Sequence, residues 1–314
     1  MTNMAILGFG VVGSGVYEAT VDNCDIIKRK CGEIKVKRIL DVLDFSAHAA
    51  GHLFAKNFEE ILDDDEISIV VESIGGLKHA YPYTKAALER GKHVVTSNKE
   101  LVATHGAELR KIAAEKGVQY LFEASVGGGT PIIRPLKTCL AVNRITEIVG
   151  ILNGTTNYIL AKMSKDGLSF ADALKKAQEN GYAESDPSAD VDGIDTCRKI
   201  AILASLAFDQ DISCDDIPVK GITGITADDI KKAAESDSVW KLVGQAKEVD
   251  GKVQCKVEPT LIPKTNLLAS VNDVFNGIIV RGTPIDEVMF YGRGAGKHPT
   301  ASAVMSDVMD IAGL

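Results

Sequence analysis

The glycine pattern close to the N-terminus constrains the fold of this chain most strongly. An apolar stretch at residues 4–8 runs directly into Gly-Phe-Gly-Val-Val-Gly at residues 8–13, and a helical pattern follows. A GxGxxG string alone is weak evidence, but at a strand-to-helix turn it is typical of a βαβ unit that binds a dinucleotide. Gly8 permits the tight turn, Gly10 lets the backbone approach a pyrophosphate, and Gly13 lets the helix pack against the strand. The start of the helix then presents free N–H groups and the positive end of its dipole to the anion. The residues predicted to contact the cofactor here are Gly8, Phe9, Gly10, Val11, Val12 and Gly13.

The remainder of the first 130 residues alternates short apolar stretches with helical patterns. The strand-like stretches are residues 36–43, 67–71, 93–96 and 120–122. The helical patterns are residues 16–30, 78–90 and 107–116. Short apolar strands separated by helices indicate a parallel sheet that helices cover on both faces. We therefore predict an α/β fold with a doubly wound (Rossmann) dinucleotide-binding domain over residues 1–130.

The order of strand-like and helical stretches changes after residue 130 and predicts a second domain of the α+β class over residues 131–291. Two turn signals, Asp250-Gly251 and Asn276-Gly277, lie beside strand-like stretches and indicate hairpins with antiparallel pairing. The strand-like stretches of this part are residues 147–152, 246–249, 252–257 and 278–281, and its helical patterns are residues 156–164, 170–180 and 194–208. A last helical pattern begins at Thr300, and we expect residues 292–314 to complete the first domain.

Composition excludes several classes of function. The chain has 314 residues, a net charge of −8 and no cluster of Lys and Arg, so we expect no nucleic-acid partner. Its apolar runs are shorter than the roughly 20 residues that cross a bilayer, so we expect no membrane partner. The N-terminus lacks the positively charged stretch of a signal peptide. Six cysteines form no CxxC pair, which favours reduced thiols in a cytoplasmic protein.

An acidic residue at the end of the second strand is expected to contact the adenosine ribose. Asp41 lies 28 residues after Gly13, somewhat later than the usual spacing of about 20, because the first helix is long. A carboxylate there accepts a hydrogen bond from the ribose 2′-hydroxyl and repels a 2′-phosphate, so NAD is slightly favoured. Asp44 takes this role if the strand ends later, and the neighbouring Lys37 and Arg38 keep NADP open.

Four aspartates gather between residues 186 and 195, which suggests a calcium loop at first sight. An EF-hand loop needs Asp or Asn at its first position and Glu at its twelfth. Those two positions hold Ser188 and Lys199, so the calcium hypothesis fails.

Asp195 and Lys199 are four residues apart and lie on one face of the helix predicted from residue 194. Ile202 and Leu206, on the same side, are apolar, and a helix that is apolar all round is buried. A buried charge is costly unless it is paired. The pattern therefore indicates that this ion pair lines a cleft, and an ordinary ion pair on the surface is the less favoured interpretation.

Several further motifs together resemble those of the homoserine dehydrogenase family. They are TSNK at 96–99, EASVGGGTP at 123–131, ILNGTTN at 151–157, GYAESDP at 181–187 running on to Lys199, and GRGAGKHPT at 292–300. The resemblance covers essentially the whole chain in the expected order. Larger relatives carry a C-terminal regulatory domain or a fused aspartate kinase, so a sequence that stops at Leu314 resembles the short, unregulated form.

The resemblance implies an NAD(P)-dependent alcohol dehydrogenase that interconverts L-aspartate 4-semialdehyde and L-homoserine in threonine and methionine biosynthesis. It implies that Lys199 is the general acid/base and that Asp195 orients it. It also implies that Glu184, Asp190 and Asp195 bind the substrate, and that Lys99 lies near the nicotinamide and the substrate. A lysine suits this role because desolvation or a second cation can lower its pKa from about 10.4 towards about 7–8.

The resemblance also implies further cofactor contacts, a cation site and a homodimer that forms through a sheet. The further cofactor contacts are Thr96, Ser97, Lys99, Gly181, Gly294 and Gly296. The cation, Na⁺ or K⁺, would bind the backbone carbonyls of Glu123, Val126, Gly128 and Thr130. The small residues of this stretch by themselves indicate only a flexible hinge between domains.

Two other functions stay open at this point. An acylating semialdehyde dehydrogenase would need a nucleophilic cysteine, and neither Cys139 nor Cys197 has a base beside it in the sequence. A dinucleotide-sensing protein without catalysis would keep the glycine turn and need no acid or base. No transition-metal site is expected, because His48 and His52 have no cysteine or carboxylate partner at ligand spacing.

Overall fold

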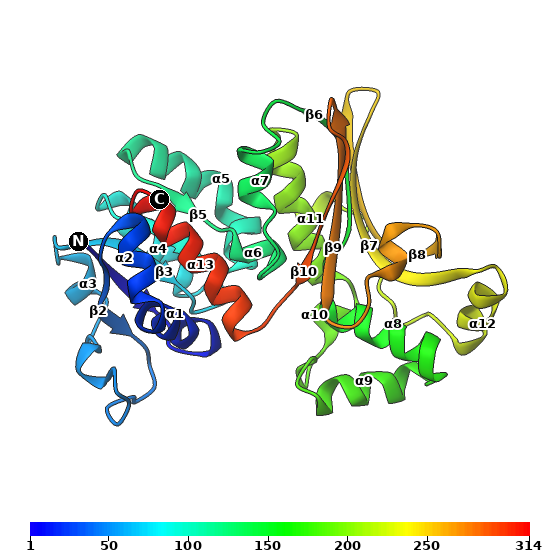
Figure 1. Cartoon of the computed structure of the whole chain (residues 1–314), viewed down its shortest axis with the longest axis horizontal. Helices are drawn as coiled ribbons and strands as arrows, with labels where there is room; N and C mark the ends of the chain where they lie inside the picture. The colour runs from blue at the N-terminus through cyan, green and yellow to red at the C-terminus, as the bar shows by residue number, and fades with distance from the viewer. The chain divides into compact units, whose positions relative to one another are not determined.

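The computed structural model describes all 314 residues and contains two compact units (Figure 1). Met1–Gly129 and Gly296–Leu314 form the first unit, and Thr130–Ala295 forms the second. The chain returns to the first unit at Gly296, four residues later than the expected position 292. The reason is that strand β10 (Asp286–Arg293) stays paired with β9 (Phe275–Thr283) up to Arg293, which lies opposite Phe275. No helix of the chain has both the length and the apolar character that a membrane span requires.

A five-stranded parallel sheet forms the centre of the first unit. Its strands are β1 (Thr2–Leu7), β2 (Ile34–Leu40), β3 (Ile67–Glu72), β4 (His93–Thr96) and β5 (Tyr120–Leu121). Their order in the sheet is β2-β1-β3-β4-β5, so the chain turns in opposite directions on the two sides of β1. In open α/β sheets a ligand binds at the carboxyl ends of the strands beside such a switch point. The doubly wound prediction is therefore confirmed.

Helices cover this sheet, and their bounds differ from two of the sequence-based expectations. The longer helices are α1 (Val11–Asp22), α2 (Cys24–Cys31), α4 (Ala80–Glu89), α5 (Lys99–Lys116) and α13 (Lys297–Ile311), and the short ones are α3 (Glu59–Leu62), α6 (Ala124–Gly127) and η1 (Gly51–Leu53). The single helix expected over residues 16–30 is wrong, because the chain leaves the helical conformation at Asn23. Helix α5 begins eight residues before the predicted start, since the Asn98 side chain caps it.

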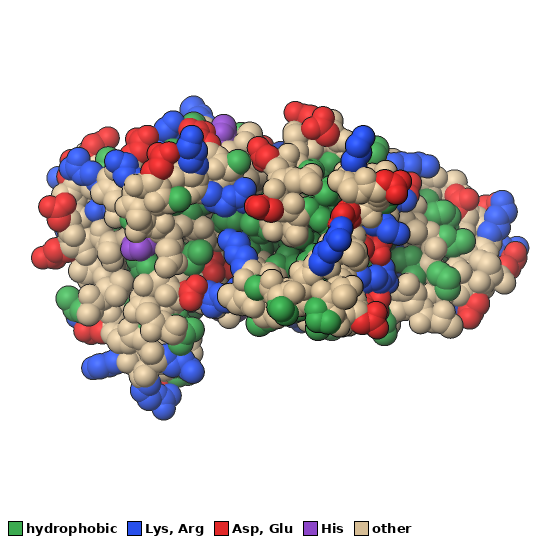
Figure 2. All heavy atoms as spheres, turned by 90° about the horizontal axis from the view of Figure 1, so that it is seen from above, with side chains coloured by type: hydrophobic (Ala, Val, Ile, Leu, Met, Phe, Trp, Pro, Cys, Tyr) green, Lys and Arg blue, Asp and Glu red, His purple; other side chains and the backbone are tan.

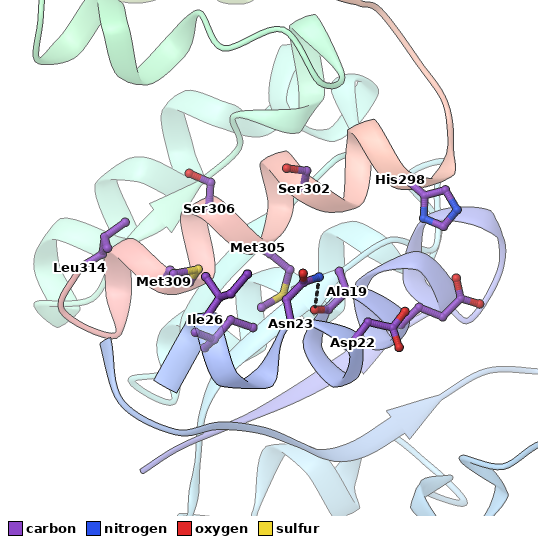
Figure 3. A pocket seen from close by; sticks show the side chains of 12 residues that line it. Ala19, Asp22, Asn23, Ile26, His298, Ser302, Met305, Ser306, Met309 and Leu314 are labelled. Carbon is purple, nitrogen blue, oxygen red and sulfur yellow. Dashed lines mark hydrogen bonds between the residues drawn. The ribbon is translucent and has the colours of Figure 1, made fainter. Parts of the chain in front are cut away.

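The C-terminal helix α13 packs against α1 in the first unit (Figure 1). Lys297 forms an ion pair with Glu18 at 2.6 Å, and a Cβ at Gly15 would lie 2.9 Å from the Lys297 side chain. Gly15 therefore allows the close approach of the two helices. A groove of about 410 Å³ runs between α13 and the helices α1 and α2 (Figure 3). None of the predicted site residues lines it.

The second unit contains a five-stranded antiparallel sheet in the order β10-β9-β6-β7-β8. Its other strands are β6 (Arg144–Ile151), β7 (Ser238–Val249), β8 (Lys252–Pro263) and β9 (Phe275–Thr283). Its helices are α7 (Ile133–Lys137), α8 (Gly154–Asp166), α9 (Phe170–Glu179), α10 (Ser188–Val191), α11 (Ile194–Ala207) and α12 (Ala227–Glu235), with 3₁₀ turns η2 (Cys214–Asp216) and η3 (Leu267–Ser270). This unit has the predicted α+β character.

The two predicted hairpin turns have different outcomes. Asp250 and Gly251 both have positive φ and join β7 to β8 with Val249 opposite Lys252, so this prediction is confirmed. The Asn276-Gly277 turn is wrong, because both residues lie inside β9. A Cβ at Gly277 would lie 2.6 Å from the Val271 side chain, so this glycine serves close packing rather than a turn.

Charged side chains are distributed over the surface of the molecule. Figure 2 shows acidic and basic side chains interspersed on the face in view, with no large field of a single sign. The net charge of −8 is thus not concentrated in one patch of this face.

Candidate active site

The glycine turn of the first unit has the geometry of an anion cradle. Gly8 follows β1 with φ +89°, and a Cβ there would lie 2.8 Å from the carbonyl oxygen of Ser73. A Cβ at Gly13 would lie 1.9 Å from the carbonyl oxygen of Gly8, so no larger residue fits either position. Helix α1 begins at Val11 without a side-chain cap, and the space beside Gly10 is open. Uncapped N–H groups at a helix start suit a pyrophosphate.

Asp41 directly follows the last residue of β2 and lies at this turn. Its carboxylate accepts hydrogen bonds from the backbone N–H groups of Phe9 at 2.5 Å and Leu43 at 2.9 Å. Asp44 lies farther along the loop and accepts from the N–H of Ser46 at 2.8 Å. Asp41, rather than Asp44, is therefore the carboxylate that the fold brings to the glycine turn.

Other side chains near this turn have roles within the protein. The Phe9 ring is buried and packs edge-to-face against Phe45 and His48, which leaves its backbone as the group that could contact a ligand. Lys37, one of the two residues that kept NADP open, forms ion pairs with Asp64 at 2.7 Å and Glu66 at 2.6 Å. Arg38, the other, donates to the backbone carbonyl of Lys37 at 3.0 Å.

Glu72 is a buried carboxylate at the end of β3 that the sequence did not single out. It accepts hydrogen bonds from the Thr96 hydroxyl at 2.5 Å and from the N–H groups of Ile74 at 2.8 Å and Gly75 at 3.4 Å. Burial raises the pKa of Glu72, and these hydrogen bonds oppose the shift. The signal that could have revealed it is an acid that ends an apolar strand just before two glycines.

A chain of hydrogen bonds connects Glu72 to the start of helix α5. Thr96, which donates to Glu72, also accepts from the N–H of Asn98 at 2.9 Å. The Asn98 side chain donates to the carbonyl of Gly76 at 2.7 Å and accepts from the N–H of Leu101 at 3.0 Å, which caps the helix.

Lys99 is the first residue of α5. The predicted cofactor contact Thr96 ends β4, and Ser97 follows that strand directly. The network from Glu72 to Asn98 therefore holds these residues at the carboxyl ends of two neighbouring strands.

The predicted ion pair of α11 is present and buried. The Lys199 ammonium lies 2.8 Å from the Asp195 carboxylate and donates to the carbonyl of Leu152 at 2.8 Å. Only 7% of Lys199 and 2% of Asp195 is exposed to solvent. Two partners thus hold the position of the ammonium nitrogen, as a buried charge requires.

Asn153 joins two of the predicted carboxylates and was missed as a site residue. Its amide donates to Asp195 at 2.9 Å and to Asp190 at 2.7 Å. Its carbonyl oxygen accepts from the N–H of Thr156 at 2.8 Å and caps helix α8. The sequence carried the signal, because Asn153 precedes Gly-Thr-Thr as an N-cap residue does.

Glu184 lies in the exposed segment between α9 and α10, and its side chain is exposed. The backbone of this segment is held in place, since Gln178 donates to the Glu184 carbonyl at 3.0 Å and Thr155 donates to the Tyr182 carbonyl at 2.7 Å. Gly181 has φ +71° and turns the chain out of α9. The fold therefore brings Asp190, Asp195 and Lys199 together through Asn153, while Glu184 precedes them on its own loop.

The predicted cation ligands lie where the chain leaves the first unit. Residues 124–127 form one buried helical turn, and Gly128 ends it with φ +57°. The N–H of Glu123 donates to Asp307 at 2.8 Å, which ties the turn to α13. Glu123, Val126 and Gly128 belong to the first unit and Thr130 to the second, so the stretch also crosses the unit boundary, as a hinge would.

The glycines at 292 and 294 approach protein groups closely. A Cβ at Gly292 would lie 2.7 Å from the Thr130 hydroxyl, and one at Gly294 would lie 2.2 Å from the Asn276 amide oxygen. Gly296 begins the return to the first unit with φ +122°. At Gly292 and Gly294, packing within the second unit is thus a sufficient reason for a glycine.

The candidate nucleophiles are placed differently from each other. Cys139 is exposed after α7, with its sulfur 3.7 Å from the Thr138 hydroxyl. Cys197 is buried in α11, and its thiol donates to the carbonyl of Cys214 at 3.6 Å. The neighbouring Cys214 thiol and burial raise the pKa of Cys197, which opposes a role as a nucleophile in the resting protein. No group of three or more His, Cys, Asp and Glu side chains is arranged to hold a metal ion.

Comparison with known proteins gives consistent matches over the whole chain. The family model described as "Homoserine dehydrogenase, NAD binding domain" matches residues 8–123, and the model "Homoserine dehydrogenase" matches residues 131–309. The homoserine dehydrogenase of Synechocystis sp. is 46% identical, over 99% of this chain and 73% of its own length. A homoserine dehydrogenase structure from Thiobacillus denitrificans has a TM-score of 0.96 at 42% identity and covers 99% of this chain and 73% of that one. A hyperthermophilic archaeal homoserine dehydrogenase in complex with NADPH has a TM-score of 0.82 at 30% identity, over 98% of this chain and 97% of that one.

Proposed function

The chain belongs to the homoserine dehydrogenase family, and on that premise we propose that it interconverts L-homoserine and L-aspartate 4-semialdehyde with Lys199 as the general acid/base. The observation that carries the proposal is the buried Lys199–Asp195 pair, 2.8 Å apart, on the same unit as Asp190 and Glu184. The runner-up hypotheses, a cysteine-dependent acylating dehydrogenase and a non-catalytic sensor, lack a comparable feature. Cys197 is buried with a raised pKa, and a sensor has no need for a buried lysine.

Lys199 moves the proton in this proposal. When bound, the nicotinamide supplies or accepts the hydride at the carbon of the reacting group. In the reducing direction the Lys199 ammonium donates a proton to the oxygen that becomes the homoserine hydroxyl, and in the oxidising direction the neutral amine removes it. Asp195 and the Leu152 carbonyl hold the nitrogen in place at 2.8 Å each, so little reorganisation accompanies the transfer.

The carboxylates around Lys199 are proposed to bind the amino-acid part of the substrate. Glu184 and Asp190 carry negative charge suited to the substrate ammonium group. Asn153 fixes Asp190 relative to Asp195 by donating to both. We place Lys99 at the reacting end of the substrate, because it begins α5 directly after the strand end that carries Thr96 and Ser97.

A dinucleotide fits the glycine cradle, since Gly8 and Gly13 leave no room for a Cβ and α1 has no side-chain cap. Asp41 supports NAD because its carboxylate lies at the turn and would repel a 2′-phosphate, and Lys37 is engaged by Asp64 and Glu66. We also propose that Na⁺ or K⁺ binds the carbonyls of residues 123, 126, 128 and 130. An all-oxygen donor set suits such a hard cation.

We further propose a cytoplasmic homodimer. The free state of all six cysteines supports a reducing compartment. The sheet of the second unit supports dimerisation, because one of its faces lies under α11 while Val149 on the other face is only partly buried.

The test is homoserine oxidation by wild type and Lys199→Ala, with NAD and NADP compared side by side. We expect wild type to reduce the nicotinamide, faster with NAD, and the variant to lose about 10²–10⁴-fold in kcat because the proton acceptor is gone. The dissociation constant for the reduced cofactor, measured by its fluorescence, should stay within about a factor of two.

Lys232→Ala is the matched control. Lys232 forms the same i,i+4 pair with Asp228 on α12, but both side chains are 68% exposed, so its loss should leave turnover unchanged. Full turnover in Lys199→Ala would refute the role of Lys199. A wild type without homoserine-dependent reduction of NAD or NADP would refute the proposed function itself.

A further inference from the structure

Two cysteines outside the proposed chemistry meet in the second unit. Cys197 lies in α11, and Cys214 begins the 3₁₀ turn η2, which packs against that helix. Their contact is close, since the Cys197 sulfur lies 3.6 Å from the carbonyl oxygen of Cys214. Cys197 is two residues from both Asp195 and Lys199, which places it about 200° around the helix from that pair. The two thiols therefore form a site of their own, distinct from the ion pair.

The two thiols differ in exposure. Cys197 is 2% exposed, whereas Cys214 is partly exposed to solvent. A reagent from solution thus reaches Cys214 more readily than Cys197. This order is the arrangement of an attacking and a resolving cysteine.

The charges around the pair favour the same order. The neighbouring Cys197 thiol and the Arg198 guanidinium lower the pKa of Cys214, against the opposing effects of burial and Asp215. The neighbouring Cys214 thiol and burial raise the pKa of Cys197. When the pair loses a proton, the negative charge is therefore favoured on the more accessible Cys214.

A third thiol nearby offers a contrast. Cys255 lies on β8, which packs against α11, and burial raises its pKa to about 11. It is partly exposed like Cys214, but burial alone shifts its pKa. Cys255 is therefore a matched thiol that should react slowly.

We propose that Cys214 and Cys197 form a thiol–disulfide exchange site that takes small disulfides such as oxidised glutathione. The Cys214 thiolate attacks one sulfur of the small disulfide, forms a mixed disulfide and releases one small thiolate. The Cys197 sulfur, after losing its proton to solvent, then attacks the Cys214 sulfur, forms the Cys197–Cys214 disulfide and releases the second small thiol. The two cysteines are oxidised by two electrons, and the small disulfide is reduced to two thiols.

The experiment uses the full chain in a Cys24→Ser, Cys139→Ser background, which removes the two exposed cysteines. Each variant is treated with oxidised glutathione, and its mass and disulfide map are followed with time. We expect the background protein to gain an internal Cys197–Cys214 disulfide without a retained glutathionyl group. Cys197→Ser should instead stop with one glutathionyl group on Cys214, and Cys214→Ser should react about tenfold more slowly or not at all. Cys197→Ala provides the same trap if the buried serine prevents folding.

Cys255→Ser is the control and should behave as the background protein does. Three results would overturn the proposal: a stable glutathionyl group on Cys214 while Cys197 is intact, an internal disulfide that involves Cys255, or equal reaction rates for Cys214→Ser and the background. These readouts are masses and do not depend on dehydrogenase activity, so they are separate from the test of the proposed function.

Discussion

Lys241 is a lysine on β7 that the protein buries without a carboxylate partner at hydrogen-bonding distance. Only 2% of it is exposed, and its ammonium donates to the Val271 carbonyl, to Asn157 at 2.8 Å and to Asn272 at 3.4 Å. Burial and the charge of Lys165 lower its pKa to about 8. The hydrogen bonds satisfy the ammonium protons, but the desolvation cost is only partly offset.

This shift predicts a specific pH dependence of stability. Between pH 8 and the unfolded value near 10.4 the unfolded chain binds more protons at Lys241 than the folded chain does. The free energy of unfolding therefore rises with pH across this window, by up to about 3 kcal/mol from this one group. The free energy of unfolding of wild type and of Lys241→Met is measured with denaturant at several pH values. The value for wild type should rise relative to that for Lys241→Met as the pH increases. Parallel stability curves for the two proteins would contradict the assignment.

At the scale of elements, the start of α5 shows how side chains from several strand ends position one helix. Glu72 on β3, Thr96 on β4 and the Asn98 cap form one chain of hydrogen bonds that ends at the first turn of the helix. Lys99 is carried at that first turn. Loss of the Asn98 cap would therefore displace Lys99, a proposed active-site residue, and also weaken the helix.

Asn98→Ala tests this coupling. The loss of the cap should cost about 1 kcal/mol of stability. It should also weaken binding of the reduced cofactor roughly tenfold. The reason is that the Asn98 side chain no longer holds the Gly76 loop, which follows β3 at the strand ends where the cofactor is proposed to bind. The control is Ser169→Ala, which removes a comparable cap from α9 in the second unit and should leave cofactor affinity unchanged. Wild-type affinity in Asn98→Ala would show that the cap has a structural role only.

The proposed homodimer rests on the face of the second unit's sheet that lies opposite α11. Alternate residues of a strand point to opposite faces. Gly244 faces α11, where a Cβ would lie 3.0 Å from Thr196, whereas Val243 on the other face lines a depression of about 190 Å³ together with Val149 and Glu258. The 3₁₀ turn η3 packs on β7 and β8 on this face, while Val149 stays partly exposed. A partly apolar face of this kind suits an interface between copies of the chain.

Val149→Glu tests the homodimer. A carboxylate on this face should separate the copies, because a charge buried without a partner destabilises an interface. Sedimentation should then show wild type at twice the mass of the variant. Val142→Glu is the control, since Val142 is 81% exposed on a loop and should leave the dimer intact. An unchanged mass for Val149→Glu would place the interface elsewhere or exclude a dimer.

The sequence by itself determined the features that depend on neighbouring residues. The glycine turn at 8–13, the alternation of strands and helices in the first unit, the Asp250-Gly251 hairpin and the Asp195–Lys199 pair all follow from short spacings, because backbone sterics and helix periodicity act over a few residues.

Only the tertiary structure decided the contacts between distant segments. It brought Glu72 to Thr96, Asn153 to Asp190 and Asp195, and Cys197 to Cys214, and it placed Asn276 and Gly277 inside a strand where local propensity suggested a turn. Each of these contacts joins residues far apart in the chain, and the local spacing of residues does not identify a distant partner. The glycine-rich turn thus fixed the class of fold, while the packing of distant residues fixed which charges and thiols meet.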